Sequence, residues 1–210
     1  EEMIPVEQMD TSYFSALVKG VHERKEMLEQ SLSAYLNEGW SFERMDGTLQ
    51  ALLLCAVYEI SNTLDVDVKV IIKEYVDLAY AFFTKYEPKM VNALLVGMEF
   101  QQMLPVFDNP AYTEGYEGFF HLCDMQGDAM TAKLTYIVRD HSAERFEGRK
   151  EQLRHIEKIL NHRWGEGTVK LTLREQYRNM REKIEPCFFL IENARKAMEA
   201  AGMKPYDEAI

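Results

Sequence analysis

The chain of 210 residues lacks a long apolar run, a signal sequence and a starting Met. No stretch reaches the roughly 18 uncharged apolar residues that a membrane-spanning helix needs, so the sequence predicts no contact with a membrane core. The first ten residues, EEMIPVEQMD, are acidic and have no signal-peptide pattern. We therefore expect a cytoplasmic chain that has been processed or cut from something longer.

Cysteine and histidine are scarce and widely spaced. Cys55, Cys123 and Cys187 fit no disulfide or metal framework, and we expect reduced, buried thiols. His155 and His162 are seven residues apart on one expected helix, but two histidines without carboxylate or cysteine companions make a poor metal site. The sequence thus predicts no metal and no cofactor.

Basic residues are few in the first part of the chain. Residues 1–88 carry 16 acidic and 7 basic side chains, whereas residues 89–210 carry 19 and 17. Strong non-specific binding to nucleic acid needs clustered Lys and Arg. The acidic first part argues against such binding.

Helical periodicity runs through residues 1–104. Asp10, Thr11 and Ser12 are N-cap candidates for a first helix, which is expected to end at 37–39. Asp46 and Thr48 are candidates for a later cap, and another helix is expected to begin near Asp67. The helix after Asp67 has an apolar stripe consisting of Ile71, Tyr75, Leu78 and Phe82. Short loops favour antiparallel neighbours, so we expect a compact helical array.

A helix from Glu87 to Leu104 completes this array. Pro88 lies in its first turn, where a missing N–H costs nothing, and Pro105 ends it. Its apolar stripe consists of Val91, Leu94, Leu95, Met98 and Met103.

After a Pro- and Gly-rich loop at 105–118 the periodicity becomes alternating. Residues 119–124 and 133–138 predict a hairpin with a turn at 125–128, and Val169, Leu171 and Leu173 predict a third strand. Two more helices are expected, one with Phe146, Leu153, Ile156 and Leu160 inward, and one at 184–201 with Phe188, Ile191, Ala194 and Met198 inward. The fold class is therefore mainly α: an all-α domain at 1–104, then an α+β domain at 105–210 with an incomplete, three-stranded antiparallel sheet.

Three segments of the first domain resemble the C-terminal part of the NusB family of transcription antitermination factors, in the alphaproteobacterial form. They are GWSFERMDGTLQALLLCAVYEI, DVDVKVIIKEYVDLAYAFF and EPKMVNALL. The resemblance covers about 3–95, and its most telling elements are Tyr58-Glu59, Ile71–Ala79 and Val91-Asn92. It implies an all-α, RNA-binding adaptor that pairs with a NusE-type ribosomal protein and binds boxA RNA. The family's Arg-rich first helix is not in this sequence, which predicts weakened RNA affinity.

The same resemblance implies contact residues. They are Lys69 and Glu74 toward the protein partner, and Lys89, Met90 and Asn92 toward RNA or the partner. The alternative for the three charged residues is that they are ordinary solvated helix charges. The alternative for Tyr58 and Tyr75 is a place in or near the core rather than stacking on RNA.

The second domain resembles the lid, or dimerisation-type, domain of the peptidase T family of zinc aminotripeptidases. The matching segments begin near Lys89 and include KMVNALLVGMEFQQMLP, YTEGYEGFFHL, LTYIVRDH, FEGRK, WGEGTVKLTL and QYRNMREKIEP. The resemblance implies a ferredoxin-like unit without its first strand, and the family's catalytic domain and metal ligands are absent from the sequence. We therefore expect no catalytic residues and no tripeptidase activity.

Two lid residues are candidates for the substrate side, Arg139 and Asn179, because the resemblance places them there. A guanidinium at Arg139 would hold a peptide carboxylate through paired hydrogen bonds. The alternative is that Arg139 and Asp140 cap the exit from strand to helix.

Three functions remain open at this point. The first is a NusB-like antitermination adaptor, and the second is a non-catalytic lid or dimerisation module that forms a homodimer through the lid sheet. The third is a chimera, joined at the string Val-Asn-Ala at 91–93, that has no evolved function of its own.

Overall fold

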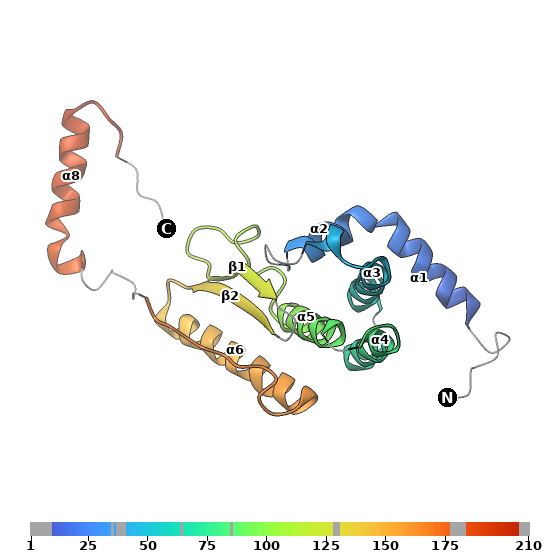
Figure 1. The fold of residues 1–210 in the computed structure, drawn as a ribbon. Coiled ribbons are helices and arrows are strands. Elements are labelled where there is room, and N and C mark those ends of the chain that lie inside the picture. Colours follow the sequence, from blue (N-terminus) through green and yellow to red (C-terminus); the bar gives the residue numbers. More distant parts are fainter. Residues whose placement is uncertain are drawn as a thin grey trace. The chain divides into compact units, whose positions relative to one another are not determined.

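The structure is a computed structural model that describes residues 10–34, 36, 41–63, 65–84, 86–127, 131–176 and 184–205. The chain divides into two compact units. The first unit is Glu1–Met103 with Leu122–Tyr136, and the second unit is Leu104–His121 with Ile137–Ile210. Figure 1 shows that the chain is mainly helical with a small two-stranded antiparallel sheet, which confirms the predicted fold class.

Aspartates cap three helices of the first unit: Asp10 and Asp46 are each one of the predicted cap candidates, and Asp67 stands where a helix is predicted to begin. The side chains of Asp10, Asp46 and Asp67 accept hydrogen bonds from backbone N–H groups two or three residues on, at 2.8–2.9 Å. These bonds satisfy donors that have no partner inside the helix. The helices of this unit are α1 (Thr11–Glu23), α2 (Lys25–Ala34), α3 (Gly47–Asn62), α4 (Val68–Phe82) and α5 (Glu87–Gln102), with a 3-10 turn at Phe42–Arg44.

The single helix predicted at the start of the chain is wrong, because α1 and α2 are separate. They meet at Arg24, whose side chain donates to Asn62 and lies over the Tyr58 ring of α3. These contacts with α3 accompany the break, and local periodicity does not reveal them. The predicted helix end at 37–39 lies outside the described residues.

The core of the first unit is organised around α3, which contacts α1, α2, α4 and α5. Its Leu53 is fully buried. The stripe predicted for α4 is partly wrong, since Leu78 is 45% exposed and Phe82 is 61% exposed. The buried face is rotated toward Ile72 and Ala79, which leaves Leu78 at its edge, and Phe82 is the last residue of the helix.

Helix α5 begins at Glu87 with Pro88 in its first turn, as predicted, and is buried on all sides from Leu94 to Phe100. The sheet pairs β1 (Phe119–Gly127) with β2 (Ala132–Arg139). Gly97 of α5 faces the hairpin, since an added Cβ would lie 2.9 Å from the Met125 methyl. Strand β1 runs past Asp124 into the turn predicted at 125–128, and Met125 is buried as a strand residue.

In the second unit, α6 (Ala143–Trp164) starts at the capping hydroxyl of Ser142 and ends at Gly165, whose φ of 109° is a backbone conformation that glycine adopts freely. A 3-10 turn (η3, Glu185–Cys187) precedes α8 (Phe189–Ala200). The inward face predicted for this last helix is wrong for the described part of the chain, because α8 buries none of its residues.

The predicted third strand at 169–173 is also wrong, because side chains of α6 take the place of a neighbouring strand. Asn161 donates from Nδ2 to the Val169 carbonyl at 2.9 Å and accepts from the Val169 N–H at 2.8 Å. Glu157 accepts from the Leu171 N–H at 2.7 Å. Exposure alternates along residues 169–173, but the segment is assigned no strand, and the hydrogen bonds of Val169 and Leu171 go to side chains of a helix.

The three cysteines all lie in the described ranges, and they form no disulfide there. Their predicted burial is wrong for Cys123 and Cys187, which are exposed, while Cys55 is half-buried. None of the helices in the described ranges combines the length and apolar character that crossing a membrane requires.

Candidate partner-binding surface

The Tyr58-Glu59 pair of α3 joins three helices of the first unit. Glu59 accepts a hydrogen bond from the Tyr75 hydroxyl of α4 at 2.7 Å and another from the Tyr13 hydroxyl of α1. Tyr58 fills the space opposite Gly20 of α1, where an added Cβ would collide with its hydroxyl. This arrangement favours a structural role for Tyr58 and Tyr75: Tyr58 packs against α1, and Tyr75 is only 9% exposed.

Burial and the bond to Glu59 raise the pKa of Tyr75 far above its ordinary value, and the bond to Glu59 also raises the pKa of Tyr13. The folded state thus keeps protons that an unfolded tyrosine loses above about pH 10. We expect the stability that these tyrosines contribute to the first unit to be fully present below about pH 10 and to be lost progressively as the pH rises further.

Urea unfolding at increasing pH measures this loss. Tyr75→Phe should abolish most of the alkaline loss of stability, and it should lower the free energy of unfolding by about 1 kcal/mol at neutral pH. Tyr80→Phe, a change on the exposed side of the same helix, serves as the control. An alkaline loss of stability that is the same in Tyr75→Phe and in the unmodified chain would contradict this assignment.

The outer face of α4 combines acidic and apolar side chains. Glu74 lies one turn from Val70 and one turn from Leu78, and all three are exposed. We call Val70, Glu74 and Leu78 the α4 surface. Lys69 is exposed on a neighbouring flank, one turn before Lys73. The structure therefore places the two predicted protein contacts, Lys69 and Glu74, on one helix but not on one face.

The predicted contact residues on α5 do not all lie at the surface. Lys89 is exposed and Asn92 is half-buried, and their spacing of three residues places them on one side of the helix. Met90 is 1% exposed, so its side chain belongs to the core and offers no surface to RNA.

Of the two lid candidates, the structure describes one, Arg139, which lies in the second unit. Arg139 is the last residue of β2 and is half-buried, and Asn179 lies outside the described residues. Asp140 accepts from the Ser142 N–H at 2.9 Å, and Ser142 in turn caps α6. Asp140 thus supports the strand-to-helix exit, while the cap itself is Ser142.

A cluster around Arg149 was not predicted. Its guanidinium donates to Asp140 at 3.0 Å, to Asp108 at 2.7 Å and to the Gly118 carbonyl at 2.8 Å, and it lies over the ring of Phe120. The FEGRK segment contains this arginine, but its partners come from distant parts of the chain. The cluster fastens the 105–118 loop to α6.

In the described ranges of the chain, no group of three or more His, Cys, Asp or Glu side chains is placed to hold a metal ion.

Comparison with known proteins assigns a different relative to each part of the chain. Residues 1–100 match the model of the NusB family. The chain is also 48% identical over 122 residues to a peptidase T of Clostridium perfringens, 46% over 117 residues to one of Alkaliphilus oremlandii, and 44% over 117 residues to one of Geobacillus kaustophilus. Both resemblances deduced from the sequence motifs are thus confirmed.

The peptidase T match covers 58% of this chain and 30% of the Clostridium perfringens relative, so the chain spans less than a third of that protein's length. The NusB match spans 100 residues and the peptidase T match spans 122. Their combined length exceeds the 210 residues of the chain, so the two matches share at least about 12 residues. A match of 122 residues must start at or before residue 89 of this chain, so residues 89–100, which lie in α5, belong to both matches.

Proposed function

We propose that the first unit is a NusB-type transcription antitermination adaptor that acts in the cytoplasm, binds a NusE-type ribosomal protein and binds boxA RNA weakly. The match of residues 1–100 to the NusB family carries this proposal, since it covers α1 to α4 and most of α5. The buried core around α3 supports it, because a docking surface needs a rigid support.

The α4 surface is the proposed site for the protein partner. Val70 and Leu78 are 50% and 45% exposed, and an exposed apolar pair flanking one charge suits a protein interface. Glu74 would direct a basic partner to this place. Lys69, on the adjacent flank, would contact the rim of the same interface.

RNA binding is proposed to be the weaker activity. Lys89 and Asn92 share one side of α5 and offer a cation and an amide to a phosphate or base. The acidic balance of residues 1–88 works against further phosphate contacts.

Reversing the charge of Glu74 tests the proposed interface. We expect Glu74→Lys to weaken binding to NusE by about tenfold or more, because the new lysine would repel a basic partner. Glu26→Lys is the matched control, with the same charge change at an exposed position on α2. Isothermal titration of each variant measures the effect; equal weakening by both would indicate a non-specific charge effect and remove α4 from the interface.

The peptidase T similarity favours a second candidate function. In this alternative the chain is a non-catalytic lid or dimerisation module, and two copies pair through the sheet. Light scattering on the full chain distinguishes the two, since a stable dimer that still forms in Glu74→Lys would support the module. We propose no tripeptidase activity for either case; zinc-stimulated cleavage of a tripeptide by the purified chain would contradict this.

The third alternative is a fused fragment without an evolved function. The division into two compact units and the overlap of the two matches favour it. Under this alternative the units melt independently and the chain binds neither NusE nor boxA.

A further inference from the structure

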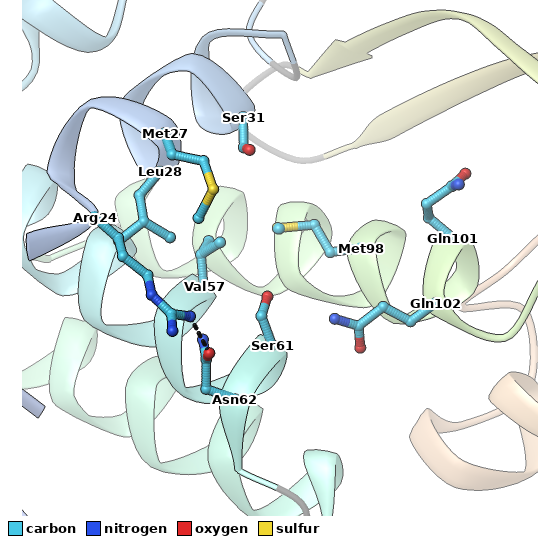
Figure 2. Close-up of a pocket in the computed structure, with 10 residues that line it drawn as sticks. All are labelled: Arg24, Met27, Leu28, Ser31, Val57, Ser61, Asn62, Met98, Gln101 and Gln102. Atoms are coloured by element: carbon cyan, nitrogen blue, oxygen red, sulfur yellow. Dashed lines mark hydrogen bonds between the residues drawn. The ribbon is translucent and has the colours of Figure 1, made fainter. Parts of the chain in front are cut away.

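A pocket of about 260 Å³ opens in the first unit, away from the α4 surface. Figure 2 shows that its lining comes from the α1–α2 junction, α2, α3 and α5. The apolar lining residues are Met27, Leu28, Val57 and Met98. The polar lining residues are Arg24, Ser31, Ser61, Asn62, Gln101 and Gln102.

Among the described residues of this lining, Arg24 is the one that carries a charge, and none is a carboxylate. One of its five N–H donors goes to the Asn62 side-chain oxygen, as Figure 2 shows. Asn62 is oriented in turn, because its Nδ2 donates to the Tyr58 carbonyl at 2.7 Å. The face of the Tyr58 ring lies 5.6 Å from the guanidinium carbon and supports it further.

The guanidinium is therefore held in place before any ligand arrives, which lowers the entropy cost of binding an anion. Ser61 immediately precedes Asn62 on α3 and adds a hydroxyl donor to the same side of the pocket. Met27, Val57 and Met98 line the same pocket as Arg24 and Ser61 (Figure 2), so a cation and an apolar wall face one space.

We propose that this pocket binds a small amphipathic carboxylate, with its carboxylate on Arg24 and Ser61 and its aliphatic chain against Met27, Val57 and Met98. A planar carboxylate fits the fork of a guanidinium through paired hydrogen bonds. At about 30 Å³ for each water-sized group, the pocket holds about eight or nine non-hydrogen groups. Hexanoate has this size and is the probe of choice.

A single cation with neutral donors suits a monoanion. A polyphosphate or an RNA backbone would bring more negative charge than Arg24 balances, on a chain whose net charge is already −11. Apolar contact with two methionines also suits an aliphatic chain, because the flexible thioether adapts to irregular shapes.

The test uses the full chain with ¹³C-labelled methionine methyl groups and NMR titration. We expect hexanoate to shift the methyl signals of Met27 and Met98 with a dissociation constant of about 1 mM or tighter. Hexanamide, which has the same size but no charge, should bind at least about tenfold more weakly. Met98→Leu assigns one of the two signals.

Arg24→Gln should weaken hexanoate binding by about tenfold or more, whereas Lys73→Gln, an equal charge change outside the pocket, should leave it unchanged. The comparison of hexanoate with hexanamide on the unmodified chain decides the outcome even if Arg24→Gln fails to fold. Equal binding of both compounds, equal shifts with inorganic phosphate, or no shift at Met27 and Met98 would each overturn the proposal.

Discussion

Replacing Arg149 with alanine is expected to lower the free energy of unfolding of the second unit by about 3–5 kcal/mol. The side chain of Arg149 is 14% exposed, and the side chain of its partner Asp140 is fully buried. Removal of the guanidinium leaves the Asp140 carboxylate without its main buried cation and the Gly118 carbonyl without a donor. It also frees the 105–118 loop from α6, because Asp108 loses the same partner.

The fluorescence of Trp164, at the end of α6, reports this loss during urea unfolding. A Trp40→Phe background makes Trp164 the sole tryptophan of the chain. Arg154→Ala is the control, because its pair with Glu151 on the same helix is largely exposed and is worth about 0.5 kcal/mol. Equal effects of the two arginine changes would show that the buried cluster does not support the unit.

Replacing Leu53 with alanine is expected to destabilise the first unit by about 3–5 kcal/mol. Leu53 has no exposed surface and belongs to the helix that contacts all the other helices of its unit. A cavity there loosens the support of the α4 surface and of the pocket together. We therefore expect partner binding and hexanoate binding to fall in parallel as the unit unfolds.

Helical circular dichroism during urea unfolding measures this change. Leu78→Ala is the matched control, since it removes the same atoms from a side chain that is 45% exposed and should cost less than about 1 kcal/mol. Similar losses for both leucines would contradict the central position of Leu53.

The starts of three helices in the first unit were predictable because their signals are local. Asp10, Asp46 and Asp67 each bond to a backbone N–H within three residues, so the cap can be identified without knowledge of the tertiary structure. That residues 169–173 do not form the expected third strand was not predictable. Val169 and Leu171 alternate with exposed residues as a strand would, but the choice between a strand and side chains of α6 depends on tertiary packing.

The candidate site was predictable only in part. The resemblance selected Glu74 and Lys89, and both are exposed, but it also selected Met90, whose burial depends on the packing around α5. Arg149 escaped prediction because Asp108 and Gly118 lie 41 and 31 residues away in sequence. A charged residue in a helix is usually solvated, so nothing local distinguished this arginine.

Titration of the full chain with NusE, with and without boxA RNA, tests the central claim most directly. We predict a dissociation constant for NusE of about 1 μM or tighter, and RNA binding that weakens only modestly between about 50 and 200 mM salt, because few phosphates are contacted. Absence of NusE binding by a chain whose first unit is folded would contradict the adaptor function and leave the fused fragment as the better account.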